Sequence, residues 1–458
     1  MSSNNIISVI DIGTTKIVAL IGKREANGTF TILGKGHVQS KGVTRGNVLN
    51  IIDTSNSIKE AVDIAEKAAG MKMTSVYVGI AGQNIACFVN SDQLYRNKSD
   101  EIITKQELDQ FIKSQENVSL DAGRQIVQII PKQFNIDGEI VENPIGCIGK
   151  RLEAQFHIIT ALSNNINSIK RCIEHANLKL KKIFLEPIAS ARAVLYPEEL
   201  EAGVAMIDIG GGTSDLAIYQ KNMLIHTGVI PFGGNAVTLD LEKIFGLTNK
   251  DAENLKVKFG KAIPEESDKE ELVIIKSNIE GREKKEIDLY TLSNIIKARI
   301  EEIFGFINQQ IALVNTQKQI KLGIVLTGGG ALLKNLPQLA SFLTTFENRI
   351  GIPLIHINEL SKDSMNNPQY ATAIGLLILG YENEILTNSD NKNEITSKLI
   401  QNDPSVVINN KDAIKTHQQE LNSISKKDKE KTKKQKGGIL TNIKNTISGI
   451  FDDSDSNL

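Results

Sequence analysis

The sequence predicts an α/β fold of two related halves that face each other across a cleft. Up to about residue 381, short apolar runs rich in Ile and Val alternate with helical patterns, which is typical of α/β architecture. Val9–Lys16 (VIDIGTTK) resembles Met206–Thr213 (MIDIGGGT), so the chain repeats itself at an offset of 197 residues (206 minus 9). The composition then changes, because residues 382–450 contain no aromatic side chain.

Length and charge narrow the class of protein. A chain of 458 residues suggests about three domains of roughly 150 residues each. Its 53 basic and 54 acidic side chains give a net charge of −1, which argues against a nucleic-acid-binding protein. The longest apolar runs, such as 373–379, fall far short of the ~20 residues of a membrane span, and residues 1–5 do not resemble a secretory signal. Cys87, Cys147 and Cys172 are too scattered for a disulfide framework or a zinc cluster. We expect a reduced, cytosolic, mostly globular protein.

Each copy of the repeat predicts a strand–turn–strand hairpin that can bind phosphate. An apolar strand ends in Asp11 or Asp208, a Gly/Thr turn follows, and a second strand begins. Glycine lets the backbone approach a phosphate closely, and Thr and backbone N–H groups donate to its oxygens. The two aspartates suit a hydrated Mg²⁺, which keeps several waters. A third apolar strand, 324–327, also runs into glycines. The Rossmann and Walker A patterns are absent, so this phosphate site is of another kind.

In this order, segments 11–16, 207–215 and 326–331 resemble the superfamily of actin, chaperone and sugar-kinase ATPases. The resemblance implies an ATP site with Mg²⁺, held through water by the two aspartates. It implies these nucleotide-binding residues: Asp11, Gly13, Thr14, Thr15, Lys16, Asp208, Gly210, Gly211, Gly212, Thr213, Glu253, Lys256, Gly328, Gly329 and Gly330. It also implies that Glu186 faces the attacking water as the catalytic residue. Glu186 also reads as a plain helix-start carboxylate, and Glu253 with Lys256 as an exposed i,i+3 ion pair.

Within the superfamily the chain is similar to the bacterial FtsA family of cell-division proteins. The likeness rests on 78–82 (VGIAG) before an insertion of about 80 residues, on 185–191 (LEPIASA), and on a polar linker before an apolar helical pattern. It implies an ATP-binding scaffold that polymerises with itself, turns ATP over slowly at most, and binds other divisome proteins. Such a scaffold tethers filaments of the tubulin-like protein FtsZ to the cytoplasmic face of the membrane at the division septum.

The same resemblance divides the chain into parts. These are a first actin-like lobe (1–83 and 163–203), an inserted small domain (84–162), a second lobe (204–235 and 306–384), a subdomain of that lobe (236–305), a disordered linker (385–436) and an amphipathic membrane-targeting helix (437–451). The FtsZ tail is expected to dock on 236–305, where one helical face is apolar. That face consists of Leu292, Ile295, Ile296, Ile300 and Ile303. The same spacing also fits a helix packed into its own core.

The C-terminal segment carries the second functional signal. Residues 385–436 are too polar to offset the entropy of ordering, which predicts a disordered linker. Within it, 426–436 holds seven lysines and two acids. One helical face beyond it is apolar: Ile439, Leu440, Ile443, Ile447, Ile450 and Phe451. This pattern favours a helix in the interface of an anionic membrane, weakened by the acidic end of the chain. The alternative is a helix that docks on this protein or on another.

Three other functions compete with the scaffold. A sugar-kinase-type phosphotransferase would need a catalytic aspartate and polar substrate-binding side chains between its lobes, and has no use for a lysine-rich tether. A chaperone of the DnaK type would carry a β-rich domain after the ATPase, where this chain has a polar linker. A soluble actin-like filament of the MreB type would make its membrane contact at the N-terminus or in a loop. The C-terminal segment therefore favours the scaffold.

Overall fold

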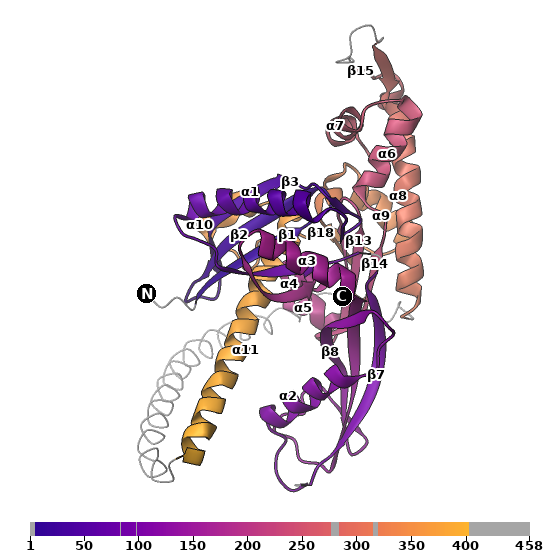
Figure 1. Cartoon of the computed structure of the whole chain (residues 1–458). Coiled ribbons are helices and arrows are strands. Elements are labelled where there is room, and N and C mark those ends of the chain that lie inside the picture. Colours follow the sequence, from indigo (N-terminus) through magenta and orange to yellow (C-terminus); the bar gives the residue numbers. More distant parts are fainter. Residues whose placement is uncertain (1–4, 83, 98, 276–283, 315–318, 403–458) are drawn as a thin grey trace, which may run out of the picture. The chain divides into compact units, whose positions relative to one another are not determined.

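The computed structural model describes residues 5–82, 84–97, 99–275, 284–314 and 319–402, and the side chains up to residue 387 (Figure 1). The contacts within the chain divide it into two units, 1–384 and 385–458. The predicted membrane helix and the lysine run both lie outside the described residues. In the described residues no helix is long and apolar enough to span a membrane.

The first lobe is built on a five-stranded sheet of order β11-β6-β1-β2-β3. Its strands are β1 (Ile6–Ile12), β2 (Lys16–Arg24), β3 (Phe30–Gln39), β6 (Ser75–Ile80) and β11 (Lys179–Leu185). Helices α1 (Ile51–Ala69) and α3 (Ser163–His175) pack on it, and a small hairpin of β4 (Val43–Thr44) and β5 (Asn47–Val48) precedes α1. Helix α1 begins where Asn50 accepts hydrogen bonds from two first-turn N–H groups, and it ends at the left-handed Gly70.

The second lobe repeats this plan in a sheet of order β14-β13-β12-β17-β18. Its strands are β12 (Val204–Ile209), β13 (Ser214–Gln220), β14 (Met223–Ile230), β17 (Ile324–Thr327) and β18 (Asn348–Ile350). Strands β1 and β2 pair antiparallel, as do β12 and β13, and each first strand also pairs parallel with a neighbour. The prediction of two related strand–turn–strand hairpins is therefore confirmed.

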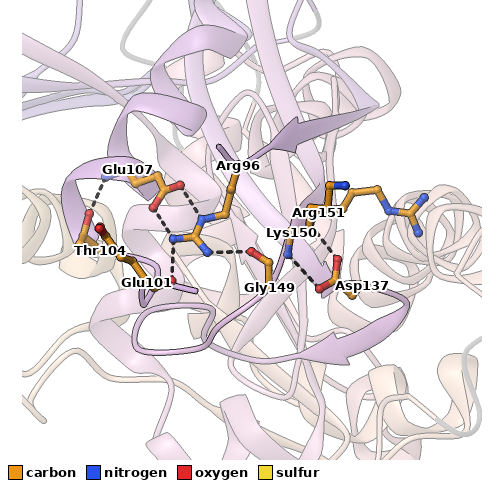
Figure 2. A network of polar contacts seen from close by, with 8 residues as sticks. All are labelled: Arg96, Glu101, Thr104, Glu107, Asp137, Gly149, Lys150 and Arg151. Atoms are coloured by element: carbon orange, nitrogen blue, oxygen red, sulfur yellow. Dashed lines mark hydrogen bonds and ion pairs between the residues drawn. The ribbon is translucent and has the colours of Figure 1, made fainter. Parts of the chain in front are cut away.

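The inserted domain is a sheet of order β7-β10-β8-β9 with one helix. It contains β7 (Ala86–Tyr95), α2 (Lys105–Ser114), η2 (Gln115–Asn117), β8 (Arg124–Ile136), β9 (Glu139–Val141) and β10 (Arg151–Leu162). In this domain the buried Arg96 donates to the Glu107 carboxylate at 2.6 Å and to the carbonyls of Gly149 and Glu101 at 2.7 and 3.0 Å (Figure 2). Asp137 likewise accepts from two backbone N–H groups.

The subdomain between β14 and β17 is mainly helical. It contains α6 (Gly234–Phe245), α7 (Asn249–Phe259), η3 (Glu266–Lys269), the hairpin β15 (Leu272–Ile275) and β16 (Lys285–Asp288), and α8 (Leu289–Ala312). The prediction that the apolar face of α8 is a docking surface is wrong for four of its five residues. Leu292, Ile296, Ile300 and Ile303 are buried in the core of the lobe, and only Ile295 is partly exposed. The face packs inward because α6 and β14 cover it.

The two lobes share a core where two helices cross. Helix α4 (Glu186–Val194) packs against the start of α11 (Ala371–Asn402), and the carbonyl of Ala189 lies where a Cβ on Gly375 would be. The other elements are α5 (Pro197–Ala202), η5 (Gly329–Leu332), α9 (Leu336–Thr344), α10 (Glu359–Met365) and η6 (Pro368–Tyr370). Residues 385–402, expected as the start of a disordered linker, continue helix α11 instead. Neither Gly nor Pro lies between Gly380 and Pro404, so nothing in the sequence stops the helix there.

Candidate functional site

The two glycine turns have the same backbone geometry. The N–H of Gly13 donates to the carbonyl of Lys16 at 3.0 Å, and the N–H of Gly210 donates to the carbonyl of Thr213 at 2.9 Å. Each turn therefore closes in the same way between its two strands. The structure thus places the predicted phosphate-binding residues of both halves in equivalent positions.

The two turns also face each other closely. A Cβ on Gly211 would lie 2.9 Å from Thr15 Oγ1, and a Cβ on Gly212 would overlap the hydroxyl of Thr14. A larger residue at either glycine would therefore require Thr14 or Thr15 to move. The threonine hydroxyls of one lobe and the glycine backbone of the other are therefore brought together, as the repeat predicts.

Asp11 and Asp208, the two predicted Mg²⁺-holding aspartates, are both buried but differ in their partners. Asp11 Oδ2 lies 3.5 Å from Lys16 Nζ. Asp208 Oδ2 accepts from Ser190 Oγ at 2.6 Å and from Thr372 Oγ1 at 3.3 Å. Burial raises the pKa of Asp208, and these two hydroxyl donors oppose that rise. Both hydroxyls come from the crossing helices α4 and α11, and the sequence analysis missed them.

Asp215 is a third buried aspartate, and it too was missed as a site residue. It pairs directly with Asp208 across β12 and β13, and among the described residues its Oδ1 has no hydrogen-bond partner. Burial raises the pKa of Asp215 well above its ordinary value, and the charge of Asp208 adds to the rise. Asp215 ends the motif Gly-Gly-Gly-Thr-Ser-Asp, but the first half has Val18 at the matching position, so comparing the repeats does not reveal it.

Glu186 is the first residue of α4, as the helix-start alternative expects, with Pro187 after it. Its carboxyl group is nevertheless close enough to the aspartates of the cleft for their charges to act on it. Burial raises the pKa of Glu186 well above its ordinary value, and the charges of Asp11, Asp215 and Asp208 raise it further. The cleft therefore brings four carboxyl groups together, those of Asp11, Asp208, Asp215 and Glu186.

Glu253 and Lys256 form the expected i,i+3 ion pair at 2.7 Å, but Lys256 is not an exposed partner. Its Nζ also donates to the carbonyl of Gly234 at 3.0 Å and to Thr238 Oγ1 at 2.9 Å. The N–H of Gly234 in turn donates to the carbonyl of Gly210 at 2.9 Å. Helix α7 is thereby tied to the second glycine turn.

The third glycine segment, Gly328–Gly330, begins where β17 ends, beside β12. A Cβ on Gly328 would overlap the Asp208 carboxylate, and one on Gly330 would overlap the side chain of Ile209. All three predicted segments therefore converge around Asp208.

These residues fit a hydrated Mg²⁺ rather than one ligated directly by a cluster of protein groups. In the part of the chain that the structure describes, no three or more His, Cys, Asp or Glu side chains are grouped so as to hold a metal ion. Two buried acceptors lack a hydrogen bond among the described groups: Asp215 Oδ1, and Asp11 Oδ2, which has only the ion pair with Lys16 at 3.5 Å. Such oxygens suit the water shell of a divalent cation, because Mg²⁺ keeps most of its waters.

Two related lobes with facing glycine turns define an actin-like fold. Solved structures agree on the fold. The PilM–PilN type IV pilus biogenesis complex matches with a TM-score of 0.60 and 13% identity, covering 82% of this chain and 98% of that chain. MreB5 of Spiroplasma citri bound to ADP matches with a TM-score of 0.51 and 15% identity, covering 84% and 99%. The predicted actin-like fold is confirmed.

Sequence comparisons identify the family. The model of cell division protein FtsA matches residues 205–375, and that of the SHS2 domain inserted in FtsA matches 82–160. Cell division protein FtsA of Neisseria meningitidis is 36% identical over 373 residues, covering 81% of this chain and 89% of that protein. The Escherichia coli K12 protein is 32% identical over 398 residues, covering 85% and 94%. The chain belongs to the FtsA family, as the sequence resemblance predicts.

Proposed function

We propose that the chain is an ATP-binding, actin-like scaffold that tethers FtsZ filaments to the cytoplasmic membrane at the division septum. The observation that carries the nucleotide part is the pair of facing glycine turns, surrounded by buried aspartates. Family membership supports the division role. The N–H groups of both turns, with Thr14 and Thr15, would bind the phosphates, and Asp11 and Asp208 would hold the waters of Mg²⁺. Mg²⁺ supplies positive charge that neutralises the phosphates.

Turnover is expected to be slow or absent. Attack on the terminal phosphate needs a positioned water, and Glu186 is the residue that the resemblance offers for this role. The resemblance offers no second residue for this role. A sugar-dependent rate would instead favour a phosphotransferase.

We place the FtsZ tail on a groove between α6 and α8 rather than on the buried face of α8. The groove has a volume of about 520 Å³ and is lined by Asp240, Ile244, Tyr290, Thr291, Asn294, Ile295, Ala298, Arg299 and Glu302. Ile244 is 60% exposed, and Arg299 binds Asp240 through two hydrogen bonds of 2.6 and 2.9 Å. The groove therefore offers an apolar contact beside charged groups that can bind a peptide backbone or its carboxylates.

The C-terminal helix would attach the protein to anionic lipid as a peripheral membrane protein. Fully burying six apolar side chains would contribute roughly 9–18 kcal/mol, at ~1.5–3 kcal/mol each. Interfacial burial is partial, and ordering costs roughly 1–2 kcal/mol per residue. The net affinity of one helix is therefore small, and filament formation would strengthen it because many helices bind together.

Two measurements test this proposal. Asp208→Ala should sharply weaken Mg-ATP binding in titration calorimetry, whereas Glu60→Ala, an exposed carboxylate on α1, should not. Equal affinities for the parent and Asp208→Ala would refute the site. Ile443→Asp with Ile447→Asp should release the protein from anionic liposomes in sedimentation, whereas Thr441→Asp with Asn445→Asp adds the same charge to the polar face and should release less. If both double variants sediment like the parent, the helix docks on a protein and the membrane role fails.

A further inference from the structure

The hairpin of β4 and β5, residues 43–48, lies against both glycine turns. Its turn residues are Arg45 and Gly46, and the N–H of Gly46 donates to Thr14 Oγ1 at 3.1 Å. A Cβ on Gly212 of the other lobe would lie 2.9 Å from the Cα of Arg45. The backbone of Arg45 therefore lies beside the tips of both turns, one from each lobe.

Arg45 has a backbone conformation that residues other than glycine disfavour. The φ angles of Arg45 and Gly46 are +47° and +75°, and a two-residue hairpin turn with both φ positive favours Asn-Gly or Asp-Gly. A non-glycine residue in the left-handed region is strained, and such strain gathers at functional sites. A turn of this kind gains nothing structurally from an arginine, so the guanidinium calls for an explanation.

The guanidinium of Arg45 is weakly held. Within the described part of the chain it lies over the ring of Phe232, whose centroid is 5.7 Å from Cζ, and makes no hydrogen bond or ion pair. Phe232 follows β14 in the second lobe and stacks on Phe306. An exposed cation–π contact is much weaker than a bidentate arginine–phosphate pair. The side chain can therefore leave the ring for an anion.

We propose that Arg45 binds the terminal phosphate of the nucleotide and so joins the two lobes across the cleft. This inference rests on the proposed ATP site. We choose the terminal phosphate rather than the ribose or base because Arg45 lies beside Thr14 and Gly212, at the tips of the two turns. The residue expected near the ribose and base is Lys256, which is hydrogen-bonded to Gly234. The guanidinium would supply the planar donor pair that phosphate oxygens accept. Lys16 is a weaker candidate for this phosphate contact, because its Nζ lies 3.5 Å from Asp11.

The test is titration calorimetry of the full chain with Mg-ATP and with Mg-ADP. Arg45→Asn removes the guanidinium but keeps a residue that suits the left-handed turn. It should lower the affinity for Mg-ATP by about tenfold to a hundredfold, the range expected for a charged hydrogen bond, and that for Mg-ADP by less than about threefold. Its thermal midpoint without nucleotide should equal or exceed that of the parent. Equal losses for both nucleotides, or none, would overturn the proposal.

Phe232→Leu serves as the matched control. It removes the ring but not the proposed phosphate contact, so its Mg-ATP affinity should stay within about threefold of the parent. A loss as large as that of Arg45→Asn would show that the guanidinium acts through Phe232, which also overturns the proposal. If the parent itself fails to bind Mg-ATP, the proposed ATP site falls. If the parent binds and Arg45→Asn binds equally, only the role of Arg45 falls.

Discussion

Asp215 is the least compensated of the three buried aspartates in the cleft, and replacing it should stabilise the protein. Asp208 accepts from two hydroxyl groups and Asp11 lies near Lys16, whereas Asp215 has only Thr213 Oγ1 at 3.5 Å. Holding its charge in the folded protein costs about 1.4 kcal/mol for each unit by which the pKa of Asp215 is raised. Asp215→Asn keeps the shape and removes the charge. We therefore expect the free energy of unfolding without ligand to rise by about 1–3 kcal/mol at pH 7.5.

The pH dependence gives this prediction its sharpest test. The pKa of Asp215 is higher in the folded protein than in the unfolded chain, so the unfolded chain loses the proton first as the pH rises. The parent therefore loses stability as the pH rises from the unfolded pKa through the folded one, and Asp215→Asn does not. The gain should vanish toward pH 4 and should grow as the pH rises above it.

Urea unfolding across this pH range, followed by circular dichroism, measures the effect. Asp109→Asn, an exposed carboxylate on α2, is the control and should change little at any pH. A variant Asp215→Asn that is less stable than the parent at pH 7.5, or a gain that does not depend on pH, would refute the reasoning. The same variant should gain less than the parent from added Mg²⁺, because it has one charge fewer to neutralise.

Three further predictions follow from packing and charge. Gly375→Val would drive a side chain into the carbonyl of Ala189 and should lower the free energy of unfolding by at least about 1–3 kcal/mol in urea titrations; an unchanged midpoint would contradict the crossing. Arg96→Leu removes the donors to the partly exposed Glu107 and should lower the free energy of unfolding by about 1.5–3 kcal/mol, measured as faster hydrogen exchange in the inserted domain. Ile244→Asp should weaken binding of an FtsZ tail peptide at least about tenfold by fluorescence anisotropy, with Mg-ATP affinity unchanged; equal peptide binding would exclude the groove.

The sequence predicted the parts of the fold that are coded locally. A strand, an aspartate and a glycine turn lie within a few residues of one another, so both hairpins and their likeness could be read directly. The repeat also predicted that the two turns face each other across a cleft, because two related hairpins indicate two related halves. The structure confirms this with Gly211 against Thr15 and Gly212 against Thr14.

The sequence could not supply contacts made over long distances along the chain. Ser190 and Thr372 lie 18 and 164 residues from Asp208, and no local pattern links them to it. The apolar face of α8 shows a second limit, since a helix in the core and a helix that docks a partner carry the same spacing. Residues 385–402 show a third limit of the sequence. A polar composition argues against a packed core, but it does not end a helix such as α11 that begins in the core and continues beyond it.

Helix α4 connects these separate observations. Its first residue, Glu186, belongs to the carboxyl cluster, and its middle supplies Ser190 to Asp208. Its last turn carries Arg192, which pairs with Glu382 of α11. Ser190 is also hydrogen-bonded to Thr372 at the start of α11. These contacts join Asp208 to both ends of the buried part of α11 through one short helix. The residues that would sense the phosphates and the helix that leads toward the C-terminal segment thus form one continuous set of contacts.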